Sequence, residues 1–144
     1  MRSPSILLKY FSLFLIIPLA GFSQEEVDYK SLVEKHEVYF LGNSIVPFTG
    51  SVRSYYDSGA LLLEGTIIDG KWEWSVMYYQ NGQKQFENHL KNGDRDGTQF
   101  WWYENGQLKS TQSYEGGVLN GPSKSWWQNG AKMGENLYLN GILQ

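Results

Sequence analysis

The sequence predicts an all-β fold, an antiparallel meander of stacked β-hairpins in about four units of 23–24 residues. A short string ending in glycine recurs four times, and its closing glycines lie 23, 24 and 24 residues apart. A second glycine follows each closing glycine by eleven residues. Such a period is typical of one supersecondary unit copied along the chain. The strings are Tyr55–Gly59, Tyr78–Gly82, Trp102–Gly106 and Trp126–Gly130.

Each unit is predicted to contain two strands on either side of its closing glycine. The first strands are expected at Ser51–Tyr56, Trp74–Tyr79, Thr98–Tyr103 and Pro122–Trp127. The second strands are expected at Leu61–Ile68, Lys84–Lys91, Leu108–Glu115 and Lys132–Leu139. Three closing strings end in Asn-Gly, which predicts two-residue type I′ turns because both central residues then take positive φ. The connectors between units, such as Asn92-Gly93, are also typical turn pairs.

The N-terminus predicts export. Arg2 and Lys9 precede a short apolar run at Phe11–Leu19, and small residues precede an expected cut between Ser23 and Gln24. The run is about half of the roughly 20 apolar residues that a spanning helix needs. We therefore expect residues 1–23 to be a signal peptide and the mature protein to be periplasmic, secreted or on the cell surface.

The remaining chain is predicted to hold one repeat domain. Residues 24–36 are a polar N-terminal segment, and residues 37–144 form the repeat domain. The stretch 37–50 is interpreted as a degenerate half-unit that caps the array, because terminal repeats must shield an open face. The four units are expected near residues 50–70, 73–93, 97–117 and 121–141.

Composition excludes several classes of partner. The net charge is −3, and removal of the signal peptide with its two basic residues makes it −5. An acidic chain has no general attraction for nucleic acid or anionic lipid, so we expect no nucleic-acid partner and no membrane contact beyond the signal peptide. Cysteine is absent, so packing of the aromatic residues, which are 16% of the chain, must stabilise the fold.

The repeated pattern of glycine, two aromatics, Asn-Gly and a second Asn/Asp-Gly resembles the bacterial variant of the MORN repeat over about residues 37–141. Pro47–Gly50 is similar to the motif that opens such arrays. The resemblance implies a stacked hairpin array without a catalytic motif, in a family described as antitoxin-like or membrane-associated. The chain departs from the pattern at Ser58, Glu73 and Gly134.

Alternation of side chains along a strand places the two aromatics of each string on opposite faces. With a two-residue turn, one column is expected on a packed face. That face would combine Tyr56, Tyr79, Tyr103 and Trp127 with Leu61, Leu63, Met77, Phe86, Trp101 and Leu108. The other column and its charged neighbours form the candidate interaction surface. This surface comprises Tyr55, Tyr78, Trp102 and Trp126 with Arg53, Lys109 and Lys124. A three-residue turn with a bulge would change the faces on one strand of each pair.

The sequence predicts no catalytic residue, cofactor or metal. His36 and His89 stand alone, so no nucleophilic triad can be assembled. Glu64, Glu87 and Glu135 repeat at equivalent positions, whereas acid–base catalysis requires carboxylates in different environments. The string from Asn92 to Gly97 matches half of a calcium loop, but Tyr103 stands where the bidentate glutamate would be needed. We interpret this string as a solvated connector.

Several functions remain open on the sequence alone. The leading prediction is a non-enzymatic scaffold that binds another envelope protein through the aromatic column. Glycan or cell-wall binding through the same rings is an alternative, and the family resemblance adds an antitoxin-like or lipid-surface role. Self-association through open sheet edges is a further alternative. The rings could also merely cover a one-layer sheet, where cross-strand pairs contribute about 0.2–1 kcal/mol each.

Overall fold

The computed structural model describes residues 26–144. The predicted signal peptide and its cut between Ser23 and Gln24 lie outside the described residues. Within the described range, no helix has the length and apolar character needed to cross a membrane.

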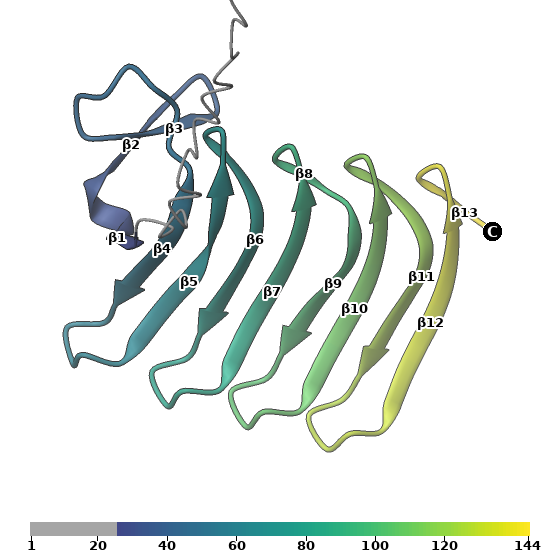
Figure 1. The fold of residues 1–144 in the computed structure, drawn as a ribbon. Helices are drawn as coiled ribbons and strands as arrows, with labels where there is room; N and C mark the ends of the chain where they lie inside the picture. The colour runs from purple at the N-terminus through teal and green to yellow at the C-terminus, as the bar shows by residue number, and fades with distance from the viewer. Residues whose placement is uncertain (1–25) are drawn as a thin grey trace, which may run out of the picture.

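The structure consists of one long twisted sheet whose strands follow one another in chain order (Figure 1). The order β1-β4-β5-β6-β7-β9-β10-β11-β12-β13 is antiparallel throughout, except that β1 runs parallel to β4. The short strand β8 pairs with β7 beside this path, and β2 and β3 form a separate hairpin. The predicted all-β meander of hairpins is therefore confirmed.

The elements before the repeats are β1 (Glu26–Asp28), the 3-10 helix η1 (Tyr29–Ser31), β2 (Leu32–Lys35) and β3 (Val38–Leu41). The first strands of the units are β4 (Gly50–Tyr55), β6 (Lys71–Tyr78), β9 (Gly97–Trp102) and β11 (Val118–Trp126). The second strands are β5 (Leu61–Ile68), β7 (Lys84–Lys91), β10 (Leu108–Glu115) and β12 (Lys132–Leu139). The remaining strands are β8 (Asp94–Arg95) and β13 (Ile142–Leu143). The second strands have the predicted bounds, and each first strand ends one residue earlier than predicted.

The turns at the closing glycines differ from the prediction. In the third unit, the N–H of Tyr103 donates to the carbonyl of Gln107, and the N–H of Gly106 donates to the carbonyl of Tyr103, both at 2.9 Å. Gly106 has a φ of +83°, whereas Asn105 is not among the residues with positive φ. The loop therefore has three residues and closes with a glycine bulge, and the predicted two-residue type I′ turn is wrong. The other three units have the same pair of hydrogen bonds.

Type I′ geometry occurs instead in the connectors at the opposite edge. In the third connector, Gly116 and Gly117 have φ values of +53° and +81°. The other connectors place Asp69, Asn92 and Asn140 at the first position, with φ of +48°, +55° and +50°. Two consecutive residues with positive φ define the type I′ turn. The Asn-Gly pairs of the connectors, and not those of the closing strings, therefore make the tight hairpins.

A side chain from the start of the same unit fastens each connector. The first turn residue of each connector donates its N–H to an oxygen on that side chain. The pairs are Asp69 N to Thr49 Oγ1, Asn92 N to Glu73 Oε1, Gly116 N to Asp96 Oδ2 and Asn140 N to Asn120 Oδ1, at 2.8–3.4 Å. Glu73, which departs from the repeat pattern, therefore supplies the acceptor that Thr49, Asp96 and Asn120 supply elsewhere.

Hydrogen bonds also join each closing loop to the next. The hydroxyls of Tyr56, Tyr79 and Tyr103 donate to the carbonyls of Tyr78, Trp102 and Trp126, at 2.7, 2.9 and 3.0 Å. The side-chain amides of Asn81 and Asn105 donate to the carbonyls of Glu104 and Gln128, at 2.8 and 3.1 Å. We call this series the loop ladder. Each asparagine also accepts from the N–H two residues later, as Asn105 does from Gln107 at 3.1 Å, so its side chain serves both its own loop and the next.

Residues 26–48 form a cap over one face of the first strands (Figure 1). The buried core consists of Phe48, Val52 and Ile67, with Val27, Leu32, Tyr39, Leu41, Leu63 and Trp72 packed against it. The segment 26–35, predicted only as polar, forms β1, η1 and β2, and the boundary expected at residue 37 falls in the β2–β3 turn. This cap gives a mostly one-layer sheet its compact core.

A buried side-chain amide bonds to the backbone in the middle of the sheet, where β8 lies between β7 and the start of β9. The side chain of Gln99 is fully buried and donates to the His89 carbonyl at 2.8 Å. The same amide accepts from the His89 N–H at 3.0 Å. The His89 carbonyl also accepts from the Asp96 N–H at 3.0 Å, so both backbone groups are satisfied although no residue of β9 pairs with His89.

Two glycine substitutions test the turn assignment. Gly116→Asn should be neutral or raise the free energy of unfolding by up to about 1 kcal/mol, since asparagine accepts this φ and restricts the unfolded chain. Gly106→Val should lower it by about 1–3 kcal/mol, because a β-branched residue is strained at positive φ. Urea denaturation of both variants measures the difference. Equal losses in the two variants would contradict the assignment.

Candidate functional site: an aromatic stripe on one face of the sheet

The four candidate rings lie on the same face of the sheet. Directly opposite residues of neighbouring strands share a face, and the pairs are Tyr55 with Leu61, Tyr78 with Lys84, Trp102 with Leu108 and Trp126 with Lys132. We call this row the aromatic stripe and its side of the sheet the stripe face. The cap packs on the other side, which we call the cap face.

The packed face predicted from the sequence needs correction. Leu61 and Leu108 were expected there, but their pairing with stripe residues places them on the stripe face. The physical reason is the three-residue loop, which pairs Leu61 and Leu108 with residues one position earlier than expected. A bulge immediately after them inserts one residue and returns the rest of each second strand to the expected face. The predicted members Leu63, Met77, Phe86 and Trp101 do share the cap face, because they pair with one another across β5, β6, β7 and β9.

The other aromatic column is not a packed face at all. Tyr56, Tyr79 and Tyr103 follow the ends of their strands and form the loop ladder through their hydroxyls. Trp127 occupies the same position in the last unit and is 54% exposed. The prediction that this column packs with the cap face is therefore wrong, because the three-residue loop begins immediately after it.

A second row of side chains runs beside the aromatic stripe, two residues further from the closing loops. In strand order it consists of Arg53, Glu64, Val76, Glu87, Phe100, Thr111, Lys124 and Glu135. Charged and apolar positions are mixed along it. Val76 is only 1% exposed although the cap lies on the other face, so neighbouring side chains must cover it. The stripe face therefore presents a line of rings bordered by a line of fixed charges.

Hydrogen bonds fix the first half of the stripe face. The hydroxyl of Tyr78 donates to Glu64 at 2.7 Å, and Arg53 forms ion pairs with Glu64 at 3.5 Å and Glu26 at 2.9 Å. Burial, followed by the hydrogen bond to Glu64, raises the pKa of Tyr78 to about 12. Tyr55 is the most open ring of this half at 45% exposure.

The middle of the stripe face contains a cluster that sequence reasoning missed. Glu87 accepts from Lys84 at 2.6 Å and contacts the His89 ring nitrogen at 2.9 Å. Partial burial raises the pKa of Glu87, but the hydrogen bonds from Lys84 and His89 outweigh it and leave the pKa below its usual range. Phe100 stacks on Trp102 with centroids 5.7 Å apart. The period-two alternation of β7 and β9 could have placed these residues together.

The two predicted lysines of the last units, Lys109 and Lys124, make different contacts. Lys124 forms an ion pair with Glu135 at 3.4 Å, and Lys132 contacts the same carboxylate at 2.6 Å. These contacts lower the pKa of Glu135. Lys109, which was predicted beside the rings, is the extra residue of the β10 bulge. Its ammonium nitrogen lies 5.5 Å from the ring centroid of Tyr103, in the loop ladder.

Across residues 26–144, no group of three or more His, Asp or Glu side chains is positioned to hold a metal ion. The carboxylate of Asp96, part of the half calcium loop in the sequence, accepts the N–H of Gly116 at 3.1 Å. The polar groups of the stripe face bond mainly to one another, which suits a preformed binding surface.

Comparison with known proteins supports the same architecture. The family model of the MORN repeat variant matches residues 95–115, which hold the β9–β10 hairpin and its closing loop. Searches of curated proteins and of solved structures gave no match. The resemblance to MORN-variant repeats is confirmed for residues 95–115, and the other three hairpins repeat the loop hydrogen bonds of the matched one.

Ionisation of Tyr78 tests the geometry of the stripe face. An unfolded tyrosine has a pKa of about 10, so a folded pKa of about 12 stabilises the protein fully below pH 10, and the contribution is lost as the pH rises towards 12. We expect Tyr78→Phe to remove the tyrosine ionisation near pH 12 from an ultraviolet absorbance titration. Tyr138→Phe, outside this network, should leave that step in place. An unchanged profile in Tyr78→Phe would contradict the bond to Glu64.

Proposed function

We propose that this protein is a non-enzymatic scaffold that binds another protein of the cell envelope through the aromatic stripe. The observation that carries the proposal is the alignment of Tyr55, Tyr78, Trp102 and Trp126 on the face opposite the cap. Aromatic side chains supply large contact area at little cost in conformational entropy, and they are enriched among the residues that dominate binding energy.

The family supports the general class. MORN repeats are interaction modules for proteins or membranes, without catalytic activity. The stripe favours a protein partner over an anionic membrane because the second row mixes carboxylates with cations. Glu64, Glu87 and Glu135 stand there in the same row as Arg53 and Lys124. Such a row can orient a partner with complementary charges, while it opposes uniformly negative lipid.

The envelope location rests on the predicted signal peptide. Export should leave a mature chain that begins at Gln24, because cleavage is expected after Ser23. N-terminal sequencing of the protein purified from the envelope fraction measures this directly. Recovery of the uncleaved chain from the cytosol would contradict the proposed location and would favour an antitoxin-like role.

Removal of two stripe rings tests the proposed surface. Trp102→Ala combined with Trp126→Ala should lower the affinity for envelope partners by about tenfold or more, since buried aromatic anchors dominate interfaces. The measurement is quantitative co-purification from solubilised envelopes, with a thermal melt to verify folding. Trp127→Ala is the matched control, because Trp127 is 54% exposed and lies outside the stripe. Equal recovery of the same partners by both variants would refute the proposal.

The same variants separate a protein partner from a glycan. If the stripe binds sugars, peptidoglycan fragments or envelope polysaccharides should change the tryptophan fluorescence of the wild type and should not change that of the double variant. If the stripe binds protein, these ligands leave the fluorescence unchanged while co-purification is lost in the double variant.

A further inference from the structure

The cap face carries two neighbouring cavities that share one wall. Each has a volume of about 320 Å³, and the indole of Trp72 lines both. Tyr29 and Tyr39 of the cap contact this indole, with ring centroids 6.2 and 5.9 Å from it. The cavities therefore lie where the cap ends and the open part of the cap face begins, on the side of the sheet opposite the aromatic stripe.

The first cavity is mostly apolar. It is lined by Tyr29, Leu63, Trp72, Ser75, Met77, Phe86, Asn88 and Leu90. The amide oxygen of Asn88 is buried and has no hydrogen-bond partner among the described residues. An unpaired buried acceptor is costly for folding, and such groups in a native structure need an explanation. The apolar walls fit an apolar side chain, and the free acceptor fits an N–H donated by the same residue.

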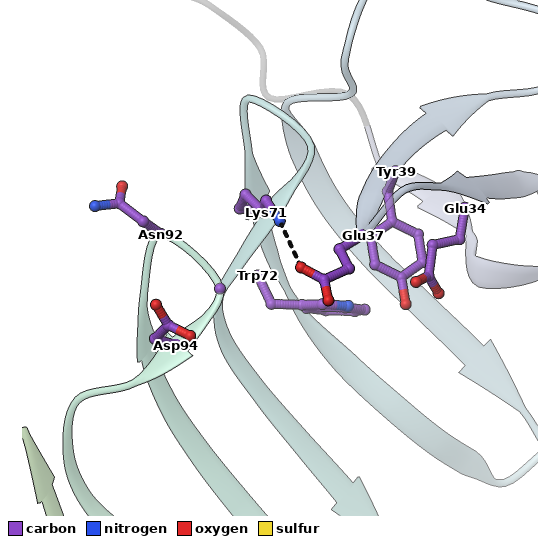
Figure 2. A pocket seen from close by; sticks show the side chains of 8 residues that line it. Glu34, Glu37, Tyr39, Lys71, Trp72, Asn92 and Asp94 are labelled. Carbon is purple, nitrogen blue, oxygen red and sulfur yellow. Dashed lines mark ion pairs between the residues drawn. The ribbon is translucent and has the colours of Figure 1, made fainter. Parts of the chain in front are cut away.

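The second cavity is acidic (Figure 2). Glu34, Glu37 and Tyr39 come from the β2–β3 hairpin, Lys71 and Trp72 from the start of β6, and Asn92, Gly93 and Asp94 from the β7–β8 turn. Glu37 and Lys71 form a loose ion pair at 3.8 Å. No ion pair joins Glu34 or Asp94 to any cation of the described chain. Three carboxylates and one ammonium leave a net charge of −2 around the cavity.

We propose that the cap face binds an extended segment of a partner protein that carries an apolar residue beside a lysine or arginine. The apolar residue occupies the first cavity, and the basic residue reaches across the Trp72 indole to the carboxylates of the second. Charge complementarity selects a basic segment, and the indole gives the cation an aromatic surface in addition to the carboxylates. Because Trp72 lines both cavities and an extended chain advances about 3.3 Å per residue, we place the apolar and basic residues one to three positions apart.

This surface is separate from the aromatic stripe. Its residues lie on the cap face, in the cap or at the neighbouring connectors, whereas the stripe residues lie on the opposite face beside the closing loops. A partner could therefore occupy both faces, or two partners could bind at once. The proposal adds a second binding surface to the scaffold, and its test does not depend on whether the aromatic stripe binds a partner.

Selection from a random peptide display library on the purified full-length chain tests the proposal. We expect enrichment of peptides with an apolar residue one to three positions from a lysine or arginine. Binding of a synthetic enriched peptide should shift the indole N–H resonance of Trp72 and the side-chain amide of Asn88 in nuclear magnetic resonance spectra. The indole resonances of Trp102 and Trp126 should stay in place. Enrichment without basic residues, or no enrichment, would overturn the proposal.

Variants that change the charge of the second cavity test the proposal further, because removing carboxylates and removing the ammonium should change the affinity for the peptide in opposite directions. Glu34→Gln combined with Asp94→Asn should weaken binding of the peptide about tenfold or more. Lys71→Gln removes the one cation among the described residues that line the cavity, and it should tighten binding severalfold, an effect that partial unfolding cannot produce. Asp57→Asn combined with Glu104→Gln changes the net charge equally at the closing loops and should have no effect. Equal affinities in all three variants would overturn the proposal.

Discussion

The architecture depends on satisfying the backbone of a sheet that has only one layer over most of its length. The strands satisfy one another, but the closing loops leave carbonyls without a strand partner. The loop ladder supplies the missing donors, since Tyr56, Tyr79 and Tyr103 each reach the carbonyl before the next loop. Each such bond contributes about 0.5–1.5 kcal/mol net, and leaving the carbonyl unpaired would cost more. The second aromatic of the first three strings, and the asparagine of the second and third, are thus explained by hydrogen bonding between units.

The sequence predicted the strands well because their signal is local. Alternating side chains and flanking glycines placed β5, β7, β10 and β12 at their observed bounds. The turn type was harder to predict, because Asn-Gly fits both a type I′ turn and a three-residue loop. In such a loop the asparagine side chain accepts a hydrogen bond from its own turn, as Asn105 does. One extra residue in that loop moved Leu61 and Leu108 to the other face, and a bulge just beyond them restored the expected pairing of the remaining residues. A period-two pattern cannot reveal such a shift.

The candidate surface was predicted in outline, and its surroundings were not. The stripe rings share a face as expected, and Arg53 and Lys124 border them, but Lys109 lies over the ring of Tyr103 in the loop ladder. The sequence predicted a cap from residues 37–50, and the part formed by residues 26–36 was missed because that polar segment has no repeat and little apolar periodicity. Its folding depends on Tyr29 and Tyr39 packing against Trp72, a contact between residues far apart in the chain. The buried Gln99 amide is equally a product of tertiary structure.

The loop ladder also gives the array a direction. Every tyrosine hydroxyl and asparagine amide donates towards the C-terminus, and every carbonyl that accepts lies in the following unit. An inner unit therefore carries both the acceptors for the preceding unit and the donors for the following one. Duplication of such a unit would lengthen the sheet without leaving a donor or an acceptor unmatched. This feature offers a simple route by which arrays of different lengths could arise from one ancestral hairpin.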